Sequence, residues 1–181
     1  EVLDLGCLPA TPFAHLQEAI QELQRLGYNV SVDSMDEAEL RRGAEAGAVY
    51  LLSLKEETLH IVDDLPAIPV LIPSQPRDLA SLGRAVAAMQ RQGRAFYADP
   101  ILDPIHFGFT ESIVRYHELR RRFPDAPVMM GVGNLTELTD ADTAGTNALL
   151  MGIISELRVG AVLTTQVSAH ARRAVKEADA A

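Results

Sequence analysis

Residues 29–54 read NVSVDSMDEAELRRGAEAGAVYLLSL, and the order of the patterns in this stretch indicates the fold class. Residues 29–32 and 49–54 read as strands, and the second is almost wholly apolar, as parallel strands covered on both faces are. Residues 35–46 between them read as a helix that ends at Gly47. A strand, a helix and a second strand in this order predict one unit of a parallel α/β sheet.

The same alternation extends in both directions along the chain. We expect further strands at residues 2–5, 69–72, 95–98, 128–131 and 161–164, and further helices at residues 15–26, 78–92, 111–123, 142–157 and 169–178. Repeated β/α units are typical of a barrel or of a doubly wound open sheet. The long series, of about seven units, and the polar residues that follow the strand ends favour the barrel.

The expected fold class is therefore α/β, a (β/α)8 TIM barrel. A complete barrel takes roughly 250 residues, whereas this chain has 181. We therefore expect a barrel that lacks its first β/α unit. Residues 1–181 are expected to form a single domain, excerpted from a longer protein.

Composition narrows the classes of partner. The formal net charge of −9 argues against nucleic acid, because little would neutralise the phosphates. No apolar run approaches the ~20 residues of a transmembrane helix, so no membrane partner is expected. Cys7 is the one cysteine, which excludes an internal disulfide and fits a reducing compartment. The expected localisation is cytoplasmic.

Asp33 is the first candidate site residue, because it follows the strand at residues 29–32 directly. Active sites of barrels lie at the carboxyl ends of the strands. The alternative is that Asp33 only begins the next helix. Ser34 and Glu37 have the spacing of a capping box, which would satisfy the first backbone donors of that helix and leave Asp33 free.

Asp103 is the second candidate, in the segment DPILDP at residues 99–104. Two Asp-Pro pairs are equally consistent with plain turn chemistry. The loop HFGF at residues 106–109 follows, and it could close over a flat ring. Asn134 ends the run GVGN at residues 131–134, where it either binds a ligand or holds a turn.

Other polar residues complete the candidate set. Those that lie at or just after the ends of expected strands include Asp4, Ser53, Asp99 and Gln166. The five histidines show no metal-ligand spacing, so no protein metal site is expected.

Several of these segments resemble dihydropteroate synthases. The runs EVLDLG at residues 1–6 and VSVDS at residues 30–34 resemble the second and third strands of those barrels. The string ILDP at residues 101–104, with the FGF that follows, resembles their sixth-strand motif. The stretch MGVGNLTELTDADTAGTNALL at residues 130–150 is similar to a synthase-like branch linked to methanopterin biosynthesis.

The resemblance implies a transferase that condenses a dihydropterin-CH2-diphosphate with an arylamine and releases diphosphate. In the methanopterin branch of one-carbon metabolism the arylamine is a ribofuranosyl-aminobenzene phosphate. The resemblance assigns Asp33 and Asp103 as catalytic and pterin-binding residues. It adds Ser53 and Asn134 to the pterin site, and Asp4, Lys55 and Gln166 as substrate or anion contacts. Mg2+ is implied for diphosphate release.

The chain departs from the synthase pattern at its basic residues. The lysine after the seventh strand and the arginine–histidine pair on the eighth are absent from GVGN at residues 131–134 and LTTQ at residues 163–166. A pterin-binding module without synthase activity, or a methyltransferase domain that binds methyltetrahydropterin, therefore stays open. The helices at residues 111–123 and 142–157 are candidates for a homodimer face.

Overall fold

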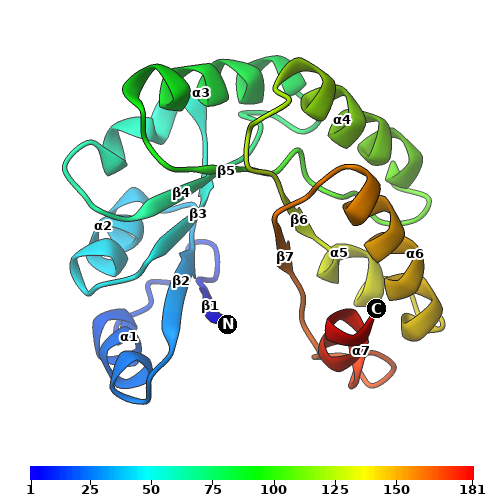
Figure 1. The fold of residues 1–181 in the computed structure, drawn as a ribbon. Helices are drawn as coiled ribbons and strands as arrows, with labels where there is room; N and C mark the ends of the chain where they lie inside the picture. Colours follow the sequence, from blue (N-terminus) through cyan, green and yellow to red (C-terminus); the bar gives the residue numbers. More distant parts are fainter. The chain divides into compact units, whose positions relative to one another are not determined.

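The computed structural model describes residues Glu1–Ala181, which separate into two compact units (Figure 1). The first unit comprises Glu1–Ser74 and Ala80–Tyr97, and the second comprises Gln75–Leu79 and Ala98–Ala181. None of the helices combines the length and the hydrophobicity needed to cross a bilayer.

The first unit is a parallel α/β layer. Its elements are β1 (Val2–Gly6), α1 (Leu16–Arg25), β2 (Asn29–Asp33), α2 (Glu37–Glu45), β3 (Tyr50–Leu54), the 3-10 helix η1 (Glu56–Val62), β4 (Ile68–Leu71) and α3 (Leu79–Gln92). The strand order is β1-β2-β3-β4, followed by the short β5 (Tyr97–Ala98) at the boundary of the units. The strands lie side by side in the order of the sequence, as successive right-handed β/α crossovers place them.

Burial explains why these segments pack in this way. Leu16 and Ile20 lie one helical turn apart on α1 and are almost completely buried, as are Val30 and Val32 of β2. The helices α1 and α2 pack on β2 and β3. The apolar side chains of β2 are therefore buried in the core, and Asp33 stands at the carboxyl end of the strand.

The start of α2 corrects one expectation. The predicted capping box of Ser34 and Glu37 does not form, and the N-cap is Asp36. The Asp36 carboxylate accepts hydrogen bonds from the N–H groups of Ala38 and Glu39 at 2.8 and 3.0 Å. A charged oxygen satisfies two of the free donors of the first turn and suits the helix dipole. Ser34 instead donates to Glu39 at 2.6 Å.

The second unit holds the remaining elements. They are α4 (Phe109–Arg122), β6 (Met129–Gly131), α5 (Gly133–Thr136), α6 (Thr143–Glu156), β7 (Ala161–Leu163) and α7 (Ala174–Ala180). β6 and β7 are parallel, with Gly131 opposite Leu163, and Ala98 forms a bridge to Val128. Arg120 of α4 stabilises the end of α6, since it donates hydrogen bonds of 2.8 Å to the carbonyls of Leu157 and Arg158.

All seven expected strands and six expected helices form, with ends shifted by up to a few residues. η1 and α5 were not expected, because each is too short to show a period in the sequence. α7 begins at Ala174 rather than at residue 169.

Candidate functional site

The carboxyl end of β2 brings together two of the expected site residues. The Ser53 hydroxyl donates a hydrogen bond of 2.5 Å to Asp33 Oδ1. Ser53 has a positive φ of 67°, and the register between β3 and β4 shifts between Leu51 and Leu54. This break in the regular pairing, together with the left-handed backbone of Ser53, can turn the side chain away from the direction it would take in an ideal strand. Asp33 is half-buried, so Ser53 holds its carboxylate in one orientation.

Asp4 forms a second carboxylate–serine pair on the same sheet. The Ser31 hydroxyl donates to Asp4 Oδ1 at 2.6 Å. Asp4 lies opposite Ser31 and Gly6 opposite Asp33, so both aspartates are on the same face, two residues apart in register. Burial raises the pKa of Asp4 to about 6, with the Ser31 hydrogen bond acting against the shift and the Asp33 charge adding to it.

Lys55 follows β3 and precedes η1. Its backbone N–H donates to the Thr58 hydroxyl at 2.9 Å, so the residue helps to begin the 3-10 helix. Its side chain is half-buried. The structure thus gives Lys55 a structural role and leaves its anion contact a prediction.

Glu39 is a buried charge that the sequence pattern did not single out. It is 4% exposed on α2, and its carboxylate accepts from Phe13 N–H at 2.8 Å and from Ser34 at 2.6 Å. These hydrogen bonds hold the pKa of Glu39 below its usual value. Burial, with the hydrogen bond and charge of Glu39, raises the pKa of the Cys7 thiol to about 11. Glu39 therefore anchors the loop after β1, and its charge disfavours the thiolate form of Cys7.

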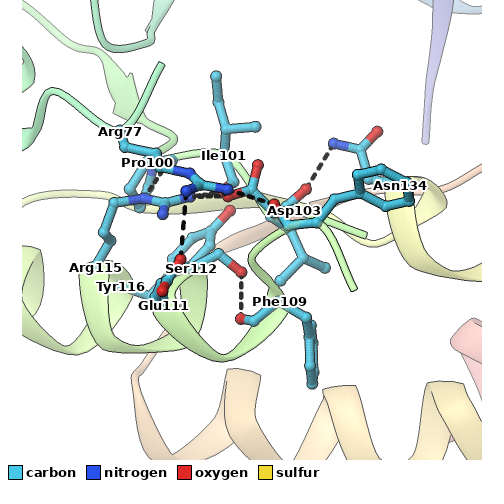
Figure 2. Close-up of polar contacts among 12 residues, drawn as sticks. Arg77, Pro100, Ile101, Asp103, Phe109, Glu111, Ser112, Arg115, Tyr116 and Asn134 are labelled. Atoms are coloured by element: carbon cyan, nitrogen blue, oxygen red, sulfur yellow. Dashed lines mark hydrogen bonds and ion pairs between the residues drawn. The ribbon is translucent and has the colours of Figure 1, made fainter. Parts of the chain in front are cut away.

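The second unit carries a network of charges around residues 99–103 (Figure 2). Asp99 follows β5 and is 8% exposed. Its Oδ1 accepts from the Tyr116 hydroxyl at 2.5 Å and from Ile101 N–H at 2.7 Å. Burial, and then the negative charge of Asp99, raise the pKa of Tyr116 well above its usual value. Tyr116 therefore stays a neutral donor that fixes Asp99.

Asp103 lies four residues further along and contacts two arginines, both through Oδ2. Arg115 Nη2 lies 2.9 Å from it and Arg77 Nε lies 3.5 Å from it. Arg115 rises from α4 and also donates to the carbonyls of Pro100 and Ile101 at 3.2 and 2.8 Å. The loop is thus held in place by one buried guanidinium.

Arg77 comes from residues 75–79, far from this loop in sequence. Its guanidinium donates to the Phe107 carbonyl and lies 3.4 Å from Glu111. Gly108 has φ of +124°, and a Cβ there would lie 2.5 Å from Arg77 and 2.8 Å from Asp103. The positive φ therefore favours glycine at this position, and a Cβ would have to displace the ends of the Arg77 and Asp103 side chains.

Asn134, in α5, lies near the same network but does not contact Asp103. Its side-chain amide donates to the Leu102 carbonyl at 3.0 Å, as Figure 2 shows. A Cβ on Gly131 would have Asn134 Nδ2 and Asp99 Oδ2 as its nearest neighbours, each at 3.9 Å. Asn134 thus holds the loop that contains Leu102, and it lies near the backbone of Gly131. Gln166 is exposed in the loop after β7.

A cavity of about 720 Å3 adjoins this network within the second unit. It is lined by Arg77, Ile105, His106, Phe107, Gly108, Phe109, Thr110 and Glu111. Phe107 is 72% exposed, so the HFGF loop presents an aromatic ring to solvent. The cavity therefore combines aromatic and apolar residues with two basic side chains, a threonine and the carboxylate of Glu111.

The expected magnesium ion finds no ready-made set of protein ligands. No three His, Cys, Asp or Glu side chains gather in an arrangement able to hold a metal. Mg2+ is commonly held by one or two carboxylates together with substrate phosphates, so its part in diphosphate release stays a prediction.

The sequence predicts only part of the network of hydrogen bonds and ion pairs around Asp103. Asp99 stood among the polar residues after the strand ends, whereas Arg77, Arg115 and Tyr116 were missed. Helical spacing places Arg115 and Tyr116 on α4, but the partner across the loop is not visible in sequence. The sequence signal that could have indicated this network is the pair of Asp-Pro steps at residues 99–104, followed by an arginine in the next helix.

Comparison with known proteins gives two results. No family model matches the chain. An uncharacterised protein of Methanocaldococcus jannaschii is 31% identical over 166 residues, which cover 82% of this chain and 31% of that protein. The chain thus spans about a third of the length of the curated relative it matches.

Solved structures provide the stronger structural likeness. Dihydropteroate synthase of Thermus thermophilus in complex with 6HMPPP matches with a TM-score of 0.66 and 18% identity, over 97% of this chain and 81% of that one. The Yersinia pestis enzyme with a pterine-sulfa conjugate matches with a TM-score of 0.66 and 16% identity, over 99% and 80%. The expected fold class is confirmed: the chain has the α/β fold of the dihydropteroate synthases, which are TIM barrels.

Proposed function

We propose that the protein binds a reduced pterin and is a transferase of the dihydropteroate synthase type. The observation that carries the proposal is Asp33, a carboxylate at the end of β2 that Ser53 holds at 2.5 Å. The synthase fold, matched over nearly the whole chain, supports it. Solved synthases include a complex with 4-aminobenzoate.

A fixed carboxylate suits the edge of a pterin. The 2-amino group and the adjacent ring nitrogen present parallel N–H donors, and a carboxylate accepts two such bonds as it does from arginine. The serine that fixes Asp33 lowers the cost of ordering it when the ligand binds. Asp33 is therefore the first residue to substitute.

The proposed reaction transfers a methylene group. The bond between the pterin CH2 carbon and diphosphate breaks, and diphosphate leaves with the electron pair. The amine nitrogen then forms a bond to that carbon and loses a proton. Positive charge develops on the methylene, and carboxylates such as Asp33 and Asp103 favour this state more than the neutral ground state.

The arylamine is proposed to be a ribofuranosyl-aminobenzene phosphate, in the biosynthesis of tetrahydromethanopterin or a related pterin cofactor. The resemblance of residues 130–150 to the methanopterin branch supports this choice. In this proposal Ser53 and Asn134 are pterin-binding residues, while Asp4, Lys55 and Gln166 contact the substrate or its anion.

A pterin-binding module without transfer is the second candidate. The observation that favours it is the absence of basic residues from GVGN at the end of β6 and from LTTQ at the end of β7. Binding of dihydropterin would be retained in such a module, but diphosphate would not be released.

The experiment measures diphosphate release from dihydropterin-CH2-diphosphate by the full-length protein, with each of two arylamines. Release with the ribofuranosyl-aminobenzene phosphate, and little with 4-aminobenzoate, supports the transferase and the branch. Asp33→Asn should reduce the rate on the order of 100-fold, since it removes charge that stabilises the transition state. Asp64→Asn is the matched control, because Asp64 is exposed between η1 and β4. Binding without release supports the module.

A further inference from the structure

The cavity beside Asp103 is not used by the proposed pterin contacts. It has a volume of about 720 Å3, and its lining includes Arg77, His106 and Glu111. All of these residues belong to the second unit. Its polar residues are two basic side chains, one carboxylate and a threonine, so the cavity suits a charged group rather than a purely apolar one.

The two arginines at Asp103 differ in what they can bind. The side chain of Arg115 is 10% exposed and is occupied by Asp103 and two backbone carbonyls. The side chain of Arg77 is 52% exposed and lines the cavity. Its contacts with Asp103 and Glu111, at 3.5 and 3.4 Å, are longer than ordinary hydrogen-bonded ion pairs. The pair with Glu111 is exposed on both sides and therefore weak. Arg77 also donates to the Phe107 carbonyl and lies beside the less exposed Asp103, so a bound ligand would replace some of these contacts.

We propose that Arg77 binds a phosphate or diphosphate group of a substrate in this cavity. A guanidinium matches two phosphate oxygens with parallel N–H donors, which an ammonium group does not do. His106 lines the same cavity and offers a further donor. Arg77 would thereby supply the anion-binding group that the ends of β6 and β7 lack. Only the identity of the anion rests on the proposed function.

Two substrates of the proposed reaction carry this chemistry. The dihydropterin carries a diphosphate, and the arylamine carries a ribosyl phosphate. The two are separated by titrating the full-length protein with inorganic diphosphate and with ribose 5-phosphate, in the absence of any pterin. Preference for one ligand names the source, and loss of that binding in Arg77→Ala assigns the site to Arg77.

Two variants should change the anion affinity in opposite directions. A folding defect would lower the affinity in both, so it cannot produce the expected result. Arg77→Ala should weaken binding of the preferred anion on the order of tenfold or more, because a charge-assisted bidentate contact is lost. Glu111→Gln should strengthen it several-fold, because a negative charge 3.4 Å from Arg77 is removed. Arg121→Ala is the matched control, since that exposed arginine of α4 pairs with Glu118 and does not line the cavity.

Equal anion affinity of the wild-type protein and Arg77→Ala, or no binding of either anion by the wild-type protein, would overturn the proposal. A protein that binds these anions through Arg77 but does not bind dihydropterin would contradict the proposed function alone. A protein that binds dihydropterin but does not bind these anions through Arg77 would contradict only the role of Arg77.

Discussion

Ser53 reaches Asp33 from a backbone conformation that serine rarely adopts. Its hydroxyl donates to Asp33 Oδ1 at 2.5 Å while its own φ is 67°. A left-handed residue other than glycine costs about 1–2 kcal/mol. The fold therefore carries a local strain at the residue that fixes the carboxylate of the proposed pterin site, as functional sites often do.

Ser53→Gly and Ser53→Ala should separate strain from function. Both variants remove the donor, so both should weaken dihydropterin binding by a similar factor, about 5-fold to 10-fold. Glycine also relieves the strained backbone, and Ser53→Gly should be more stable than Ser53→Ala by about 1 kcal/mol. Urea denaturation and calorimetric titration measure the two quantities. Equal stability of the variants would show that Ser53 is not strained.

Asp4 should make the free energy of unfolding fall between about pH 4 and pH 6. Its pKa in the folded protein is about 6, above the ordinary value of 3.8, so the folded state holds the proton more tightly within this window. The stabilisation is fully present below the ordinary value and is lost as pH rises through 6, for a total on the order of 2–3 kcal/mol.

Asp4→Asn tests this expectation, because asparagine keeps an acceptor for Ser31 but does not titrate. The difference in stability between the variant and the wild-type protein should grow in favour of the variant from pH 4 to pH 7. Several carboxylates with lowered pKa act in the opposite direction, so the difference is the quantity to measure. A difference that is constant with pH would contradict the raised pKa, and Asp64→Asn is the control.

Gly108 should tolerate alanine poorly. A Cβ there would meet Arg77 at 2.5 Å and Asp103 at 2.8 Å, in addition to the cost of its positive φ. Gly27 also has a positive φ, of 91°, but a Cβ there would meet nothing within 4 Å. Gly27→Ala should therefore cost about 1 kcal/mol of stability, and Gly108→Ala about 1–3 kcal/mol more. Thermal unfolding of both variants checks this order, and similar costs would mean that the side chains around Gly108 yield freely.

Much of the first unit follows from the sequence, because its interactions are local or periodic. The apolar run at residues 49–54 and the spacing of Leu16 and Ile20 specify elements that can be read without tertiary information. The start of α2 was predicted incorrectly because two capping options compete within three residues. Asp36 prevails over Ser34, since Ser34 is engaged by the buried Glu39.

The candidate site was less accessible to prediction for a physical reason. The pairing of Asp33 with Ser53 lies at a register shift of β3, which the apolar pattern of that strand does not reveal. The contact between Arg77 and Asp103 joins residues 26 positions apart in sequence, beside a loop in which Gly108 has a positive φ. Sequence identified the carboxylates, whereas their partners depend on tertiary structure.

Tyr116 should contribute strongly to stability although it lies outside the proposed pterin contacts. Its hydroxyl is the donor to the buried Asp99 at 2.5 Å. Tyr116→Phe leaves that carboxylate with one donor fewer, which should cost about 1.5–3 kcal/mol. Chemical denaturation measures the loss, and Tyr28→Phe is the control because Tyr28 is exposed after α1. A loss as small as that of the control would mean that water replaces the hydroxyl.

A crystal structure of the full-length protein soaked with 7,8-dihydropterin bears on the whole proposal. The expected result is density for the bicyclic ring with its 2-amino and ring N–H groups against the carboxylate of Asp33, and Ser53 still bonded to Oδ1. Ring density elsewhere, with Asp33 unchanged in its contacts, would contradict the proposed pterin site.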